Sequence, residues 1–138
     1  MATILIVEDN PTNMRLAAYV LESAGHTVLP AANAEAGLTL ARASLPDLIL
    51  MDIQLPGMDG LEATGHLKAD PATRAIPVIA LTALAMKGDE ERIRAAGCDG
   101  YIAKPMSYRG LLSTIAARLH GAAVGEESGP ETGRSVPD

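Results

Sequence analysis

Residues 3–11 read Thr-Ile-Leu-Ile-Val-Glu-Asp-Asn-Pro, and this stretch decides the fold class. Its first five residues are a continuous run of β-formers, which is typical of a strand in a parallel sheet covered by helices on both faces. The run ends in the acidic pair Glu8 and Asp9. Asn10 and Pro11 then supply a helix N-cap and an N1 proline, so a helix is predicted to begin directly afterwards. The stretch therefore predicts a buried strand, an acidic turn and a helix in succession.

The same alternation recurs along the chain. Further strands are predicted at residues 27–29, 47–51, 76–81 and 100–103. Asn33 and Ser107 are expected to cap the second and fifth helices, with helices at residues 61–69 and 85–96 between them. Gly65 weakens the third helix, because an interior glycine costs about 1 kcal/mol relative to alanine. Five β-α units in strict alternation predict an α/β fold, an open, doubly wound five-stranded parallel sheet with five helices.

The composition changes at residue 121. From there on the chain is rich in glycine, proline and acidic residues, which neither propagate a helix nor fill a core. We therefore predict a single domain at residues 1–120 and a flexible tail at residues 121–138.

Composition and charge exclude several classes of function. The chain has 138 residues, 48% of them hydrophobic, as expected for one globular domain. Its formal net charge of −6 means that nucleic acid and anionic membranes repel it. Cys98 is the single cysteine, which excludes an intrachain disulfide and a multi-cysteine zinc site. The longest apolar run, residues 76–86, is too short to span a bilayer. We expect a cytoplasmic protein with neither nucleic-acid nor membrane partners.

Polar residues follow the predicted strands at the edge where open α/β sheets bind their ligands, outside the carboxyl ends of the strands. Glu8 and Asp9 follow the first strand, Asp52 the third, Thr82 the fourth and Lys104 the fifth. Each has an ordinary structural explanation when taken alone: the aspartates and the threonine could cap helices or begin turns, and the lysine could be solvated.

Taken together, the three carboxylates are harder to explain structurally. At about 4 Å and an effective dielectric near 20, each like-charge pair costs about 4 kcal/mol. A divalent cation with oxygen ligands would remove this cost, and Mg²⁺ is typically bound by one or two carboxylates and several waters. Residues 8–11 are not glycine-rich and so do not resemble a phosphate-cradling P-loop. The sequence therefore predicts a metal site at this edge.

Four motifs carry a resemblance to a known family. They are Ile-Leu-Ile-Val-Glu-Asp-Asn at residues 4–10, Leu-Ile-Leu-Met-Asp-Ile-Gln-Leu-Pro-Gly-Met-Asp-Gly at 48–60, Ala-Leu-Thr-Ala at 80–83 and Ala-Lys-Pro at 103–105. In this order the sequence resembles the receiver domain of bacterial two-component response regulators, a flavodoxin-like (βα)₅ fold similar to CheY, over Ala2 to Leu119. It departs from the commonest pattern in having Glu8-Asp9 for two aspartates. It looks most like stand-alone receivers of the cell-division type and receivers attached to hybrid kinases.

The resemblance implies a role for each matching residue. Asp52 would accept a phosphoryl group from a histidine kinase or a histidine phosphotransfer protein, and Thr82 and Lys104 would hold its oxygens. Asp9, Asp52 and the backbone carbonyl of Gln54 would ligate Mg²⁺, with Mn²⁺ as a substitute. Glu8 would act mainly through water.

The resemblance also implies a switch. Thr82 and Tyr101 match the hydroxyl and aromatic positions that respond to phosphorylation, and they would reshape the surface of the fourth helix, fifth strand and fifth helix for a downstream protein. A shift from 1:99 to 99:1 would need about 5.5 kcal/mol of differential stabilisation. The alternative for Tyr101 is a strand-edge tyrosine whose hydroxyl faces water. Pro105 is a candidate cis peptide. The protein would be a monomer or a weak, phosphorylation-linked dimer.

Two other functions use similar residues. An Mg²⁺-dependent phosphatase of the haloacid-dehalogenase type also forms an aspartyl-phosphate, but it places its nucleophile and a second aspartate on the first strand, where this chain has Glu8-Asp9-Asn10-Pro11. A pseudo-receiver would keep the fold without phosphorylation. We expect a phosphoryl acceptor and not an enzyme that turns over small substrates.

Overall fold

Five parallel strands form one sheet in the order β2-β1-β3-β4-β5. The computed structural model describes residues 2–83, 87–104 and 107–124. The strands are β1 Thr3–Val7, β2 Thr27–Ala31, β3 Leu48–Asp52, β4 Val78–Thr82 and β5 Gly100–Ala103. The helices are α1 Pro11–Ser23, α2 Ala34–Ser44, α3 Gly60–Ala69, α4 Lys87–Ala95 and α5 Tyr108–Val124. The predicted doubly wound α/β fold is confirmed.

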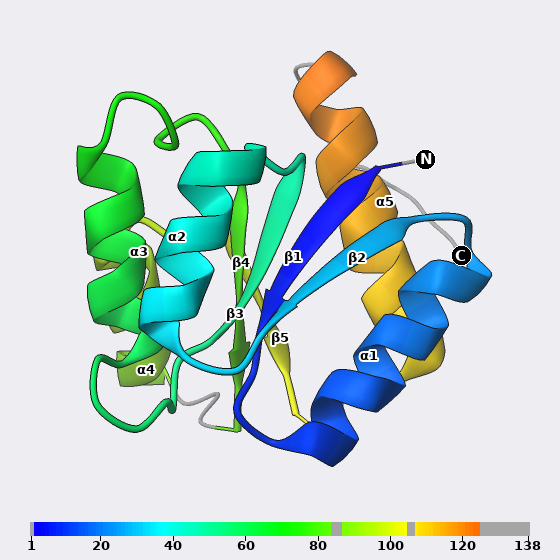
Figure 1. Ribbon diagram of the computed structural model, residues 1–138, viewed down its shortest axis with the longest axis horizontal. Coiled ribbons are helices and arrows are strands. Elements are labelled where there is room, and N and C mark those ends of the chain that lie inside the picture. Colours follow the sequence, from blue (N-terminus) through cyan, green and yellow to red (C-terminus); the bar gives the residue numbers. More distant parts are fainter. Residues whose placement is uncertain (1, 84–86, 105–106, 125–138) are drawn as a thin grey trace.

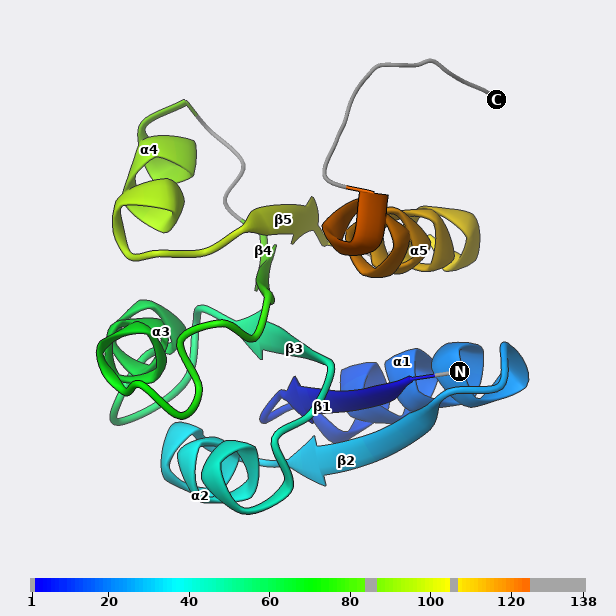
Figure 2. The same cartoon turned by 90° about the horizontal axis from the view of Figure 1, so that it is seen from above.

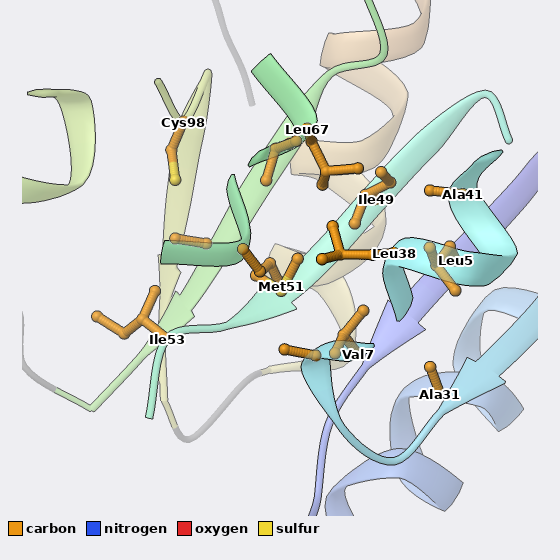
Figure 3. Close-up of a cluster of buried hydrophobic side chains, with 14 of the residues drawn as sticks. Leu5, Val7, Ala31, Leu38, Ala41, Ile49, Met51, Ile53, Leu67 and Cys98 are labelled. Atoms are coloured by element: carbon orange, nitrogen blue, oxygen red, sulfur yellow. The ribbon is translucent and has the colours of Figure 1, made fainter. Parts of the chain in front are cut away.

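Helices cover both faces of this sheet. Figures 1 and 2 show α2, α3 and α4 on one face and α1 and α5 on the other. Successive strand residues point to opposite faces, so Leu5 and Val7 pack toward α2 and α3, in the cluster drawn in Figure 3. Ile4 and Ile6 pack into the second cluster, with residues of α1 and α5. Burial on both faces explains why β1 and β3 are continuous apolar runs.

Side-chain caps fix where the helices begin. The predicted caps Asn10 and Asn33 are confirmed, since each Oδ1 accepts a hydrogen bond from the backbone N–H three residues later, at 3.0 and 2.8 Å. Ser107 caps α5 in the same way, because its Oγ accepts from the Gly110 N–H at 2.9 Å. Asp59 caps α3, so this helix starts at Gly60, one residue before the predicted start.

Two of the helices run through glycine residues. Gly65 lies within α3 and does not interrupt it, because Ala63 and Leu67 anchor the helix in the core on either side. Helix α5 continues to Val124 and so passes through Gly121, although the sequence from residue 121 on was expected not to propagate a helix. The domain boundary at residue 120 stays a prediction. An interior glycine costs only about 1 kcal/mol, which a helix anchored by Leu111 and Ile115 tolerates. Residues 125–138 of the predicted tail, like Pro105, lie outside the described residues.

The topology places the ends of two central strands side by side. The chain leaves β1 toward β2 on one side, and β3 leads to β4 on the other, so the direction of winding reverses between β1 and β3. Open α/β sheets bind ligands at such a reversal, outside the carboxyl ends of the strands. Among the described residues, no helix is both long enough and apolar enough to cross a bilayer.

Candidate functional site

Three carboxylates meet at the carboxyl ends of β1 and β3. Asp52 is the last residue of β3, and Glu8 and Asp9 directly follow β1. One carboxylate oxygen from each residue lies within 4.8 Å of the other two. Glu8 and Asp52 are buried, each with 2% of its surface exposed, whereas Asp9 is exposed. The predicted convergence of Glu8, Asp9 and Asp52 is therefore present.

Lys104 brings a positive charge into the same cluster. It follows β5 directly, and its ammonium Nζ lies 3.0 Å from Asp52 Oδ2 and 3.1 Å from Glu8 Oε1. Its backbone N–H donates to the Thr82 carbonyl oxygen at 2.7 Å, so β4 fixes the backbone position of Lys104. Three carboxylates and one ammonium leave a formal excess of two negative charges (3 − 1 = 2). One divalent cation would balance it.

Backbone N–H groups hold the two buried carboxylates. The Gln54 N–H donates to Asp52 Oδ1 at 2.9 Å, and the Asn10 N–H donates to Glu8 Oε2 at 3.2 Å. The other Glu8 oxygen, Oε1, is buried and accepts no hydrogen bond from any described residue. The Lys104 ammonium approaches this oxygen as an ion pair without hydrogen-bond alignment. A buried carboxylate oxygen that accepts no hydrogen bond fits a site that is completed by a cation or by a water bound to that cation.

The electrostatics of the cluster favour added positive charge. Burial raises the pKa of Glu8, and the neighbouring Asp52 carboxylate raises it further, because both disfavour another negative charge there. Burial also disfavours the charged form of Lys104, but the hydrogen bond to Asp52 and the charges of Asp52 and Glu8 outweigh this effect and raise the pKa of the lysine. Its ammonium therefore stays charged.

Thr82 and Gln54 flank the carboxylates. Thr82 ends β4, is fully buried, and pairs in register with Ala103, the residue before Lys104. Gln54 is exposed and contributes its backbone N–H to Asp52. The role of its carbonyl as a metal ligand stays a prediction. The donor set as a whole, with hard carboxylate oxygens and no sulfur or imidazole, suits Mg²⁺.

The Tyr101 hydroxyl is bonded to α4. Tyr101 lies in β5 and is half-buried, and its Oη donates to Glu90 Oε2 at 2.5 Å. The hydroxyl therefore has a carboxylate partner on α4, and a role of Tyr101 in a switch stays a prediction. The sequence analysis missed Glu90, because a single glutamate in an acidic helix turn carries no local signal of a tyrosine partner eleven residues later.

Gly60 is a second residue that sequence reasoning missed. A Cβ at this position would lie 2.2 Å from the Asp52 carbonyl oxygen and 2.6 Å from the Ile53 Cα. The Gly60 N–H also donates to the Ile53 carbonyl at 3.2 Å. Helix α3 thus packs its first residue directly on the backbone that carries Asp52. The available signal was a glycine that directly follows the helix-capping Asp59.

Comparison with known proteins gives one consistent family. The model for the response regulator receiver domain matches residues 4–116. The polar-differentiation response regulator DivK of Brucella anthropi is 52% identical over 117 residues, which cover 85% of this chain and 95% of that protein. The DivK protein of Brucella ovis is 51% identical over the same length.

Solved structures agree with the sequence relatives. The receiver domain of the sensor histidine kinase PA1611 of Pseudomonas aeruginosa PAO1 has a magnesium ion coordinated in its active-site cleft. It is 39% identical, with a TM-score of 0.79 over 87% of this chain and 98% of that one. A putative response regulator of Chloroflexus aurantiacus is 32% identical, with a TM-score of 0.83 over 86% of this chain and 98% of that one.

Proposed function

The chain belongs to the response regulator receiver domain family, and on this premise we propose that Asp52 is its phosphoryl acceptor. One observation carries the proposal: Asp52 is a buried carboxylate at the end of β3, grouped with two further carboxylates and 3.0 Å from an ammonium. A purely structural role does not call for three carboxylates at one point. A phosphoryl site with a cation does.

The acceptor step follows from the chemistry of a carboxylate. An oxygen of Asp52 forms the bond to phosphorus, while the bond from phosphorus to the donor's histidine nitrogen breaks and its electron pair stays on the imidazole. A carboxylate is a nucleophile that needs no general base. The Gln54 N–H on Oδ1 fixes the orientation of Asp52.

Charge stabilisation is assigned to Lys104 and Thr82. In phosphoryl transfer the charge is spread over the three equatorial oxygens, so catalysis consists mainly of positioning and cationic stabilisation. Lys104 already lies beside Asp52 Oδ2 and would pair with one oxygen of the attached phosphoryl group. The Thr82 hydroxyl, at the end of the neighbouring strand, would donate to another.

The metal fits the remaining groups. Asp9, Asp52 and the Gln54 carbonyl would hold Mg²⁺, or Mn²⁺ in its place, and Glu8 would contact its waters. The buried Glu8 Oε1 without a hydrogen-bond donor and the excess of carboxylates support this assignment. When bound, the ion neutralises negative charge on the incoming phosphoryl group.

The output is assigned to a change of surface. Phosphorylation adds roughly −1.5 to −2 charge and strong acceptor oxygens at Asp52. Thr82 and Tyr101 would respond and reshape the surface of α4, β5 and α5, where a downstream protein would bind. The donor is a histidine kinase or a phosphotransfer protein, and the receiver acts in the cytoplasm as a monomer or a weak dimer.

Incubation with acetyl phosphate and Mg²⁺ tests the acceptor. Intact mass should rise by one phosphoryl group in the wild type and not in Asp52→Asn. Asp47→Asn is the matched control, because Asp47 directly precedes β3 at its opposite end and is exposed. An equal gain in wild type and Asp52→Asn would place the acceptor elsewhere. Steady release of phosphate from small phosphomonoesters would favour the phosphatase alternative, and no labelling would favour the pseudo-receiver.

A further inference from the structure

The hydrogen bond between Tyr101 and Glu90 has no part in the chemistry assigned to the site. Tyr101 Oη donates to Glu90 Oε2 at 2.5 Å, and this bond connects β5 with the first turn of α4. The acceptor is a carboxylate, and hydrogen bonds to ionised acceptors are shorter and stronger than neutral ones. This contact therefore contributes to the position of both the tyrosine and the helix.

Helix α4 has few other attachments. Of its residues 89–95, for which burial is described, Ile93 is the one buried side chain. The helix sequence, Lys-Gly-Asp-Glu-Glu-Arg-Ile-Arg-Ala, is otherwise mostly charged. The Glu90–Tyr101 bond thus acts where this helix has little apolar contact with the sheet.

The register places Tyr101 next to Thr82 on one face of the sheet. Tyr101 lies opposite Ala80 of β4, and Thr82 is two residues further along that strand. Ala80 and Tyr101 both belong to the cluster under α3 and α4, and strand alternation puts Thr82 on the same face. The two proposed switch residues are therefore neighbours, but the Tyr101 hydroxyl is engaged at α4.

We propose that Glu90 is a positioning residue of the switch, which holds the Tyr101 hydroxyl on α4 and so opposes the phosphorylated arrangement. This inference rests on the proposed function of Asp52, Thr82 and Tyr101. A ring that follows Thr82 inward must first release Glu90, and the first turn of α4 then loses its hydrogen bond to β5. The bond stabilises only the arrangement in which the Tyr101 hydroxyl lies on α4. Removing it therefore shifts the equilibrium between the two states and should favour the phosphorylated one.

Beryllofluoride with Mg²⁺, a mimic of the phosphoryl group, tests the inference through its dissociation constant. We expect Glu90→Ala to bind it about three- to tenfold more tightly than the wild type, where tenfold corresponds to about 1.4 kcal/mol. Glu91→Ala is the matched control, because it removes the same charge from the next, exposed position of α4. The control should bind with wild-type affinity. A purely electrostatic effect of lost negative charge would appear in both variants and would overturn the inference.

A double-mutant cycle separates positioning from a general change in helix stability. In the Tyr101→Phe background, which lacks the donor hydroxyl, Glu90→Ala should cause no further change in affinity. The same tightening with and without the hydroxyl would overturn the inference, as would equal affinities of wild type and Glu90→Ala. Failure of the wild-type chain to bind beryllofluoride at all would instead overturn the proposed function. The two failures are thus distinguishable.

Discussion

The charged side chains of the site differ widely in their exposure to water. Asp9 is exposed, whereas Glu8 and Asp52 retain 2% of their surface, and the Lys104 side chain retains 17%. Charges with little access to water interact more strongly and are screened less by salt. The buried residues therefore set the electrostatics of the site, and Asp9 is the one of the three carboxylates that faces water.

Lys104 is expected to be essential for rate. Lys104→Met keeps an unbranched side chain and removes the ammonium that lies beside Asp52 and Glu8. We expect labelling by acetyl phosphate to slow about 100-fold or more, the loss typical when a charge-stabilising group is removed from an active site. The time course of intact mass measures the rate, with circular dichroism as the check that the variant is folded. A rate within a factor of about three of wild type would contradict this role.

His26 is expected to reduce stability in acid. Burial lowers its pKa below the ordinary 6.5, and its Nδ1 accepts a hydrogen bond from the Ala2 N–H at 3.1 Å. The folded chain therefore takes up this proton less readily than the unfolded chain. Stability from His26 is complete above about pH 6.5 and is lost as the pH falls through the lowered pKa of the folded state.

Urea denaturation at about pH 7.5 and about pH 5.5 measures this effect. The decrease in unfolding free energy toward acid should be smaller in His26→Gln than in the wild type. His66→Gln is the control, because His66 is exposed on α3. The effect should be modest, since His26 is only partly buried. An identical pH dependence in all three proteins would show that His26 does not contribute.

At the scale of the elements, the start of α3 leaves no room for a side chain at its first residue. Its first residue, Gly60, packs against the backbone of Asp52 and Ile53, and its cap Asp59 holds the Glu62 N–H at 2.8 Å. The loop between β3 and α3, which contains Gln54, is therefore bounded on both sides by close backbone contacts. A helix terminus here helps to fix the backbone of Asp52, the proposed phosphoryl acceptor.

Two glycines of α3 should respond oppositely to alanine. Gly60→Ala places a Cβ 2.2 Å from the Asp52 carbonyl oxygen, so we expect a loss of about 1–3 kcal/mol or more in unfolding free energy. At Gly65 an added Cβ meets nothing within 4 Å, and Gly65→Ala should stabilise the protein by about 0.5–1 kcal/mol. Denaturant titration measures both. Equal destabilisation by the two variants would contradict the close approach at Gly60.

In the molecule as a whole, the strand order concentrates negative charge at one point. The chain carries a net charge of −6, and β1 and β3 place three carboxylates at their adjoining ends. The apolar core around β1 and β3 leaves Glu8 and Asp52 little contact with water, whereas Asp9 is exposed. Folding therefore creates a local excess of negative charge that the unfolded chain does not have.

Mg²⁺ should consequently stabilise the folded chain. At a concentration of ten times the dissociation constant, a ligand that binds only the folded state adds about 1.4 kcal/mol, or about 5 °C in Tm for a domain of this size. Chelation should remove the gain. Asp9→Asn should weaken the response, whereas Asp47→Asn, at the opposite end of β3, should keep it. An unchanged Mg²⁺ response in Asp9→Asn would exclude this residue as a ligand.

Local sequence patterns predicted most of the elements. The continuous apolar run of β1 and the N-caps Asn10 and Asn33 depend on residues that are neighbours along the chain, so they can be read without the fold. The regular alternation of strands and helices also implied the parallel topology, and with it the meeting of Glu8, Asp9, Asp52 and Lys104. The continuation of α5 past Gly121 was not predicted, because glycine content alone does not say how firmly the preceding helix is anchored.

The sequence by itself thus determined the order of the elements and the chemical composition of the site, since both follow from hydrophobic periodicity and from which residues end each strand. Only the tertiary structure decided how deeply each carboxylate is buried, that Gly60 touches the backbone of Asp52, and that Tyr101 bonds to Glu90. These features depend on contacts between different elements at a precision of a few tenths of an ångström. Such contacts are set by packing, which no pattern within one segment encodes.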